Sequence, residues 1–163
     1  MGRDRLDFFE ILRSLTVREV EFIVVGGVCG ILHGAPISTF DLDIVHSRTP
    51  ENIERLADAL QDLSARYRGI TAGAREPSRQ DLSGPGHHLL ITRDGPLDVL
   101  GMVGRGRGYS DLLNKTVGMD VGGMTIRILD LPGLIEVKEE TITEKDKVVL
   151  AILHRLLEEQ RGA

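Results

Sequence analysis

Three aspartates are the side chains of this sequence with the clearest capacity for chemistry. Asp41 and Asp43 alternate with apolar residues across positions 40–44, so a β-strand would place both carboxylates on one face. Asp98 lies in a later apolar segment that is also expected to be a strand. Carboxylate oxygens are the ligands that Mg²⁺ takes in phosphoryl and nucleotidyl transfer. The three aspartates are therefore predicted to bind one or two Mg²⁺ ions, with Asp98 also serving as general base.

The simpler interpretation of these acids is that each one points into solvent from an exposed strand face. The sequence Asp41-Leu42-Asp43 alone does not exclude it. If the acids are instead clustered and buried, their like charges repel and raise one another's pKa values unless a cation lies among them.

A pair of glycines precedes the aspartates. Gly26 and Gly27 end a β-branched run at positions 20–25 and come before a short apolar segment with helical spacing. Glycine lets the backbone approach a phosphate closely, and the start of a helix presents free amides to an anion. A glycine pair is by itself more often a turn than a phosphate site. Its position before the aspartates is what makes a phosphate-binding role worth predicting.

The order of these features is typical of a known superfamily. Val24-Val25-Gly26-Gly27, thirteen further residues and then Asp41-Leu42-Asp43-Ile44 resembles the signature of the DNA polymerase beta-like nucleotidyltransferases. Positions 33–45 look like the minimal nucleotidyltransferases that include AbiEii-type toxins. Those proteins often carry an arginine where this chain has Ile37 or Ser38.

The resemblance also implies contacts to a nucleoside triphosphate, ATP being one candidate. Thr39 belongs to the Thr-x-Asp segment, and Lys138 followed by Lys145-Asp146 resembles a late lysine and Lys-Asp pair of the family. Gly26, Gly27, Thr39, Lys138 and Lys145 are thus the candidate nucleotide-binding residues. The alternative for each lysine is an ordinary solvated position on a helix.

The elements that must position these residues follow from periodicity, turn residues and helix caps. Thr49-Pro50 and Asp130 are expected to start helices, and Asp94-Gly95 and Gly122-Gly123 to form hairpin turns. The predicted helices are at about 6–15, 28–32, 49–63, 109–115, 131–138 and 144–159. The predicted strands are at 20–25, 40–46, 88–93, 96–101, 116–120 and 124–129.

Residues 66–86 are predicted to be a long connection, with a weak strand near Ile70. This segment contains the best local candidates for binding nucleic acid, although a solvated loop is the simpler interpretation. The candidates are Arg66, Arg68, Arg75 and Arg79, with Tyr67 as a stacking platform.

Composition limits the protein class. The chain has 163 residues and a formal net charge of −5, which argues against a broad basic face for duplex nucleic acid. With 41% hydrophobic residues it is expected to be one soluble globular domain over 1–163, with a core at about 20–130 and C-terminal helices at about 131–160. Cys29 is the one cysteine, so no intramolecular disulfide can form. No long apolar stretch predicts a membrane anchor, and a cytoplasmic location is expected.

Other signals are weak. Gly26-Gly27-Val28-Cys29-Gly30 lacks the spacing of a dinucleotide-binding loop. Cys29 is predicted to be a core thiol, and the segment 104–108, rich in Gly and Arg, to be a surface connection. The histidines lack zinc-site spacing and are given structural or solvent roles; they are His33, His46, His87 and His88.

The sequence therefore predicts an α/β (α+β) nucleotidyltransferase fold, a mixed twisted sheet with flanking helices. The predicted reaction moves a nucleoside monophosphate from an NTP to a hydroxyl of RNA, protein or a small molecule, with a toxin–antitoxin context as one setting. The acceptor is not defined, and a partner protein or a homo-oligomer could supply its recognition. The alternatives are a catalytically degenerate member that binds nucleotides or proteins, and an unrelated α/β domain with surface acids.

Overall fold

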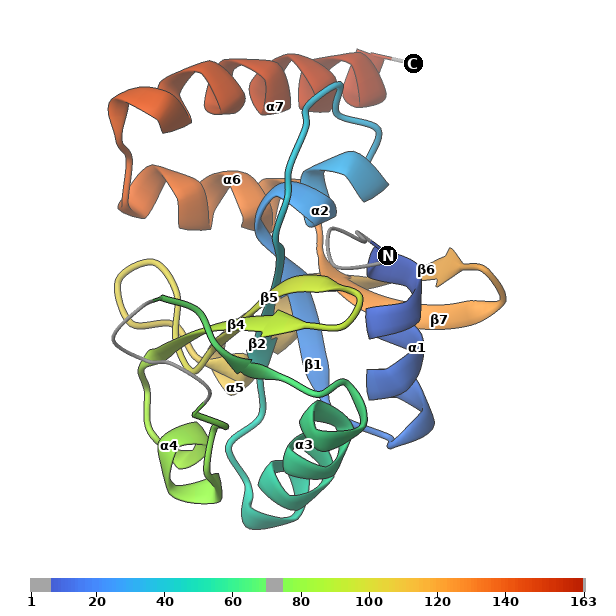
Figure 1. Ribbon diagram of the computed structural model, residues 1–163. Coiled ribbons are helices and arrows are strands. Elements are labelled where there is room, and N and C mark those ends of the chain that lie inside the picture. Colours follow the sequence, from blue (N-terminus) through green and yellow to red (C-terminus); the bar gives the residue numbers. More distant parts are fainter. Residues whose placement is uncertain (1–6, 70–74, 163) are drawn as a thin grey trace.

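The computed structural model describes residues 7–69 and 75–162 (Figure 1). In this part of the chain, helices and strands alternate through most of the sequence. The helices are α1 (Phe8–Val17), α2 (Gly26–Leu32), α3 (Pro50–Asp62), α4 (Arg79–Ser83), α5 (Tyr109–Leu112), the 3-10 turn η1 (Leu113–Lys115), α6 (Leu131–Glu140) and α7 (Glu144–Gly162). The strands are β1 (Phe22–Val25), β2 (Leu42–His46), β3 (Arg66–Tyr67), β4 (His87–Thr92), β5 (Gly95–Leu100), β6 (Thr116–Val121) and β7 (Met124–Leu129).

The described strands form one seven-stranded mixed sheet in the order β3-β4-β5-β2-β1-β7-β6. The neighbours β2 and β5 are parallel, as are β1 and β7, and the other neighbouring pairs are antiparallel. Parallel neighbours need a crossover, and β2 reaches β5 through α3, β3, α4 and β4. The predicted mixed sheet with flanking helices is confirmed.

Local chemistry explains where several helices begin. The Thr49 hydroxyl accepts from the amide of Asn52, and Pro50 occupies the first turn of α3. Asp130 accepts from the amide of Gly133 at 2.7 Å and caps α6. Both caps were predicted from the sequence.

Two predictions about local structure need correction. The β4–β5 hairpin pairs Thr92 with Gly95, so its two turn residues are Arg93 and Asp94 rather than Asp94 and Gly95. Gly95, with φ of +129°, lies at the first position of β5 and supplies a backbone conformation that other residues rarely adopt.

The segment 66–86 is more ordered than a plain connection. Its strand is at Arg66–Tyr67, and α4 is capped reciprocally by Ser78 and Asp81. The strand predicted near Ile70 falls outside the described residues.

Helices cover the sheet in two groups (Figure 1). One group consists of α2, α6 and α7: α2 packs on β1, β2 and α6, and α6 packs on α7. In the other group, α1 contacts α3, and α3 contacts α4. The buried apolar residues of the sheet and both groups form one continuous core. No helix in the described ranges is long and apolar enough to cross a membrane.

Candidate functional site

Two of the predicted acids meet in the middle of the sheet. Asp43 on β2 is the register partner of Asp98 on the parallel strand β5, so both side chains leave the same face of the sheet. Asp43 is also paired with Val25, the last residue of β1, whose next residue is Gly26. Asp41 is half-buried but precedes β2, which begins at Leu42, so the prediction that one strand carries both Asp41 and Asp43 is wrong. The acids and the first glycine are therefore neighbours, which contradicts the interpretation of three separate surface aspartates.

Burial and like charge weaken the acidity of this pair. The pKa of Asp43 rises from the ordinary 3.8 to about 7, because the carboxyl is desolvated and because Asp98 and Asp41 lie nearby. Lys138 partly opposes this rise. The pKa of Asp98 is also raised, mainly by burial, although the positive charge of Arg68 opposes the shift. Such a pair is expected to be stabilised by an added cation.

The glycines make the close packing beside the acids possible. Gly26 has φ of +68°, and a Cβ at this position would overlap the carboxylate of Asp43. A Cβ on Gly27 would lie 2.7 Å from Cβ of Thr39. The Thr39 hydroxyl donates to the carbonyl of Asp41 at 3.3 Å. Gly26 thus adjoins Asp43, and Gly27 adjoins Thr39, whose hydroxyl bonds the backbone of Asp41.

A cavity of about 280 Å³ opens at this point. Gly26, Asp43 and Lys138 contribute to its lining, together with apolar side chains of α6 such as Leu134 and Val137. A carboxylate, a glycine backbone and an ammonium group therefore share one cavity with an apolar wall. This combination can accommodate a phosphorylated ligand with an apolar or aromatic part.

Lys138 is held in place by the next helix. Its Nζ donates to Oδ1 of Asp146 at 3.1 Å, and Asp146 also accepts from the hydroxyl and the amide of Thr143 at the start of α7. Of the Lys145-Asp146 pair noted in the sequence, Asp146 is therefore the residue that contacts Lys138. Lys145 is exposed and is not among the residues that line the cavity.

Similarity to solved structures identifies the fold. A nucleotidyltransferase candidate from Thermotoga maritima, TM1012, is 16% identical with a TM-score of 0.53, and the match covers 93% of each chain. ANT(2'')-Ia in complex with adenylyl-2''-tobramycin is 13% identical with a TM-score of 0.60, covering 94% of this chain and 89% of that one. The chain has the nucleotidyltransferase fold.

A solution structure of the antibiotic-resistance factor ANT(2'')-Ia has the same fold. It is 13% identical with a TM-score of 0.57, and the match covers 92% of this chain and 82% of that one. No protein-family model matches the sequence, nor does any curated protein.

One residue at this nucleotidyltransferase-fold site was not predicted from the sequence. Arg68 follows β3, and its Nη2 lies 2.7 Å from Oδ1 of Asp98. The simpler interpretation of Arg68 as a solvated loop residue is therefore wrong. The pairing of β3 with β4 brings Arg68 close to Asp98, and no local sequence motif predicts that pairing.

The fit of a divalent cation to the acids can be tested on Asp98. Its Oδ1 is buried and has no hydrogen-bond partner in the part of the chain that the structure describes, although Arg68 makes an ion pair with it. The desolvated carboxyls of Asp43 and Asp98 supply hard oxygen donors, which suit Mg²⁺. As the side chains lie, no three His, Cys, Asp or Glu residues within 7–69 and 75–162 form a metal-binding cluster. Asp41, Asp43 and Asp98 are thus suitable ligands by chemistry, with Arg68 at the oxygen of Asp98.

The segment expected to carry the family arginine contributes no cation to the site. Ile37 is half-buried, and its Cδ1 would lie 3.1 Å from a Cβ built on Gly30 of α2. Ser38 is exposed. This segment therefore supplies no arginine to the predicted nucleotide site.

The weaker signals have structural explanations. Burial raises the pKa of Cys29 to about 12, so this core thiol remains protonated. Each of the four candidate histidines makes a hydrogen bond: His33 to the Leu129 carbonyl, His46 to the Leu82 carbonyl, His87 to the Met102 carbonyl and His88 to the Tyr67 hydroxyl. The connection at 104–108 is anchored to α6, because Arg107 pairs with Glu136 and Glu140.

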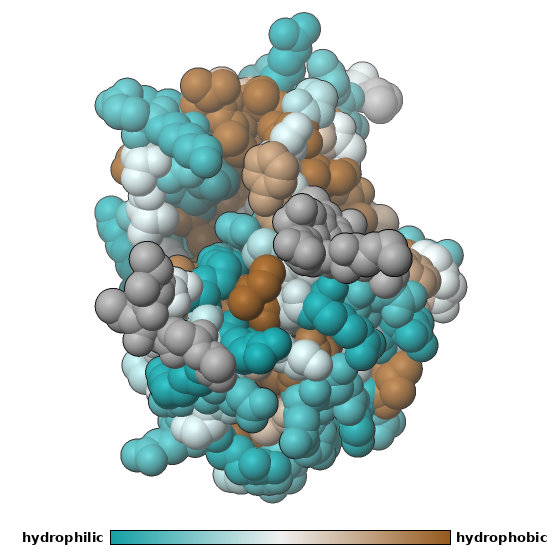
Figure 2. Space-filling model, viewed as in Figure 1, coloured by the Kyte–Doolittle hydropathy of each residue, from teal (hydrophilic) through white to brown (hydrophobic). Residues whose placement is uncertain are grey.

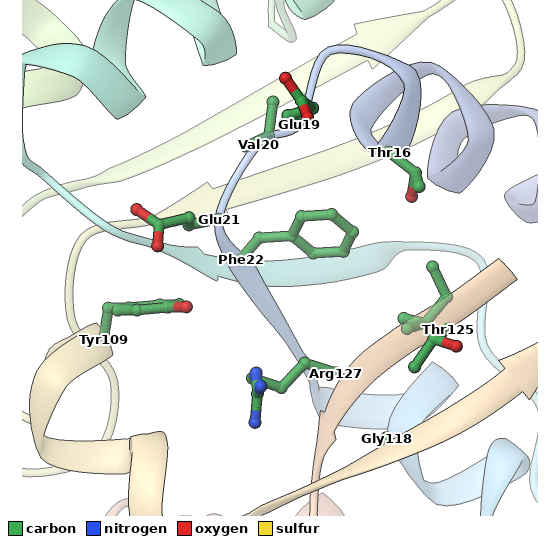
Figure 3. Close-up of a pocket in the computed structure, with 10 residues that line it drawn as sticks. Thr16, Glu19, Val20, Glu21, Phe22, Tyr109, Gly118, Thr125 and Arg127 are labelled. Atoms are coloured by element: carbon green, nitrogen blue, oxygen red, sulfur yellow. The ribbon is translucent and has the colours of Figure 1, made fainter.

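A second cavity, of about 340 Å³, lies apart from the acids (Figure 3). Glu21, Tyr109 and Arg127 are among its lining residues, and it shares none of them with the cavity at Asp43. It contains none of the predicted site residues. Size alone therefore does not locate the candidate site.

Proposed function

We propose that this protein is a Mg²⁺-dependent nucleotidyltransferase that moves a nucleoside monophosphate from an NTP to a hydroxyl acceptor. The observation that carries the proposal is the register pairing of Asp43 with Asp98 directly beside Gly26. The pair adjoins a cavity that also contains Lys138. Two largely desolvated carboxyls side by side, one of them against the first residue of a helix, are costly for a fold that does not use them, and this supports a functional site.

Asp41, Asp43 and Asp98 are the residues that would hold the metal. When bound, Mg²⁺ supplies charge neutralisation for the triphosphate and for the departing pyrophosphate. Burial and mutual repulsion of Asp43 and Asp98 favour such a cation, because it removes the cost of ionising both groups.

The remaining groups bind and orient the substrate. Lys138 and Gly26 both line the cavity, and we propose that the Lys138 ammonium and the backbone at Gly26 and Gly27 contact the triphosphate. Thr39 supports the glycines by packing against Gly27. Lys145, exposed on α7, is proposed to reach the triphosphate only through its long side chain.

In the proposed reaction, the acceptor oxygen attacks the α-phosphorus while the bond between that phosphorus and the bridging oxygen breaks. The bond electrons leave with pyrophosphate, and the hydroxyl proton passes to a carboxylate oxygen of Asp98. The acceptor class is open; the ANT(2'')-Ia complex with adenylyl-2''-tobramycin supports a small-molecule hydroxyl as one candidate beside RNA and protein.

Calorimetric titration with ATP, GTP, CTP and UTP, with and without Mg²⁺, tests the proposal. We expect at least one nucleotide to bind wild type in Mg²⁺ and to lose affinity by roughly tenfold or more in Asp41→Ala/Asp43→Ala. The matched control is Glu158→Ala/Glu159→Ala, which removes two exposed carboxylates from α7. Equal binding by all three proteins, or no binding of any nucleotide to wild type, would reject the proposed site.

A second candidate function is a degenerate nucleotidyltransferase fold that acts as a nucleotide-binding or interaction module, including a toxin–antitoxin component related to AbiEii-type toxins. Ile37 in place of the family arginine favours it. Transfer of label from an α-labelled NTP to any acceptor, abolished in Asp43→Ala, would reject this alternative.

A further inference from the structure

Arg68 is fixed in place by the neighbouring strand before it reaches the acids. Its backbone amide donates to the carbonyl of Leu89, and its Nη1 donates to the carbonyl of Leu90, each at 2.9 Å. The other end of the guanidinium lies against Asp98. Arg68 therefore spans from the backbone of β4 to the carboxylate on β5.

The contact with Asp98 places a positive charge among the acids. Within residues 7–69 and 75–162, Arg68 is the one cation that makes an ion pair with Asp43 or Asp98. The side chain of Asp98 is 14% exposed and that of Arg68 is 28% exposed, so solvent screens the pair only partly.

The pair is nevertheless incompletely bonded. Oδ1 of Asp98, which lies 2.7 Å from Nη2 of Arg68, has no hydrogen-bond partner of good geometry among residues 7–69 and 75–162. The guanidinium thus neutralises the carboxylate by proximity, without the aligned N–H···O bonds that make an arginine–carboxylate pair strong. A divalent cation at the same oxygen would bring more charge and a direct bond to it.

Two cations cannot occupy one carboxylate oxygen without repulsion. A metal ion that takes Oδ1 must displace the guanidinium, whose anchor to the Leu90 carbonyl keeps it beside the site. The nearest new anion would be the triphosphate, for which arginine is a well-suited ligand.

We propose that Arg68 is a positioning residue that exchanges partners: it holds Asp98 in the metal-free protein and moves to the triphosphate when a divalent cation takes that carboxylate. The inference rests on the proposed function, since it requires a metal and an NTP at this site.

Opposite effects of one substitution test this exchange. In Arg68→Gln, we expect Mn²⁺ alone to bind roughly threefold or more tightly, because the competing cation is gone. The same variant should bind ATP in the presence of Mg²⁺ roughly fivefold or more weakly, because a phosphate ligand is lost. Arg68→Lys keeps the charge and should restore Mn²⁺ affinity to near the wild-type value while restoring ATP affinity only in part. A purely structural role would weaken both or change neither.

Arg93→Gln is the matched control. Arg93 also bonds one backbone carbonyl, that of Asp62, and pairs with one aspartate, Asp94, in the same hairpin, but Asp94 is not one of the three proposed metal ligands. Mn²⁺ binding is measured by electron paramagnetic resonance and ATP binding by calorimetry, with circular dichroism to confirm that each variant is folded.

The outcomes separate the two proposals. If wild type binds Mn²⁺ and ATP at Asp43 but Arg68→Gln shows unchanged or weaker Mn²⁺ binding, the exchange is rejected and the proposed function survives. If neither wild type nor Arg68→Gln binds Mn²⁺ at millimolar concentration, both proposals fail.

Discussion

Asp43 is a residue whose ionisation costs the folded protein stability. Its carboxyl has a pKa of about 7 in the folded chain, against an ordinary 3.8. The unfolded chain therefore releases this proton at lower pH than the folded chain does. Between about pH 4 and pH 7 the folded state gradually loses the advantage of holding the proton, and above pH 7 the loss is complete.

The first prediction concerns Asp43→Asn without metal. Its melting temperature should match wild type near pH 4 and exceed it by roughly 5 °C at pH 8, because asparagine carries no charge to bury. Thermal melts from pH 4 to 8 measure the difference, with the exposed Glu158→Gln as control. A difference that is the same at every pH would show that packing, and not ionisation, is responsible.

A second residue-scale prediction uses two glycines with positive φ. Gly26→Ala should destabilise the protein by roughly 1 kcal/mol or more beyond Gly34→Ala, measured by urea unfolding. Both substitutions strain the backbone, because φ is +68° at Gly26 and +99° at Gly34. A Cβ at Gly26 would overlap the Asp43 carboxylate, whereas a Cβ at Gly34 has no described atom within 4 Å. Equal losses would mean that the contact with Asp43 has no energetic consequence.

The sequence predicted the residues at the centre of the candidate site but did not predict that Arg68 lies beside them. Asp43, Asp98 and Gly26 could be identified because each belongs to a local pattern with a chemical meaning. Arg68 could not, because only the pairing of β3 with β4 brings it to Asp98. Asp146 was noted only as part of the Lys145-Asp146 pair, and its contact with Lys138 of the preceding helix was not predicted.

Among the elements, α6 and α7 determine one wall of the cavity. Lys138 near the end of α6 is tied to Asp146 in the first turn of α7, and Glu139 is 3.9 Å from His154 further along α7. The first ion pair is about four-fifths buried, and the second is about half exposed. Only Lys138 also lines the cavity.

The third prediction follows from this difference. Asp146→Asn should weaken ATP binding in Mg²⁺ by roughly fivefold, because the Lys138 ammonium loses its charged anchor. Glu139→Gln removes the other link between the same helices and should leave the affinity within about twofold. Calorimetry on both variants measures the effect. Similar losses would indicate that the helix pair as a whole, and not Lys138, affects the cavity.

Element predictions from sequence succeeded where a cap or a turn residue marks the boundary. Thr49 and Asp130 cap the helices that they were expected to cap, and Gly122 and Gly123 form the β6–β7 turn. The β4–β5 turn was misplaced by one residue because two candidate turn pairs overlap at Asp94. The short helix α4 was missed because its five residues give too little periodicity.

For the whole molecule, a shared core joins the C-terminal helices to the sheet. Leu134 of α6 and Leu153 of α7 belong to the same buried cluster as Val24 of β1 and Ile44 of β2. The face in Figure 2 is largely hydrophilic over the strands, whereas apolar groups gather over the end formed by α6 and α7. If residues 1–163 are one domain, as predicted, the sheet and the C-terminal helices should unfold together.

The fourth prediction is that the chain unfolds in one cooperative transition. Circular dichroism and calorimetry should give the same midpoint, with calorimetric and van't Hoff enthalpies in agreement. Leu153→Ala, at a position with no exposed surface, should lower the stability of that single transition by roughly 2–4 kcal/mol. Separate melting of helical signal would show instead that α6 and α7 form an independent unit.

The pairing of β2 with β5 also affects the order in which the molecule assembles. Asp43 and Asp98 are register partners although more than fifty residues of chain separate them. Closing so long a loop is slow, and the repulsion between the two carboxylates opposes the final step. The acid pair is thus expected to form after the folding transition state. A bound cation would then act mainly on the unfolding rate, so that it lengthens the lifetime of the native state while hardly changing how fast that state is reached.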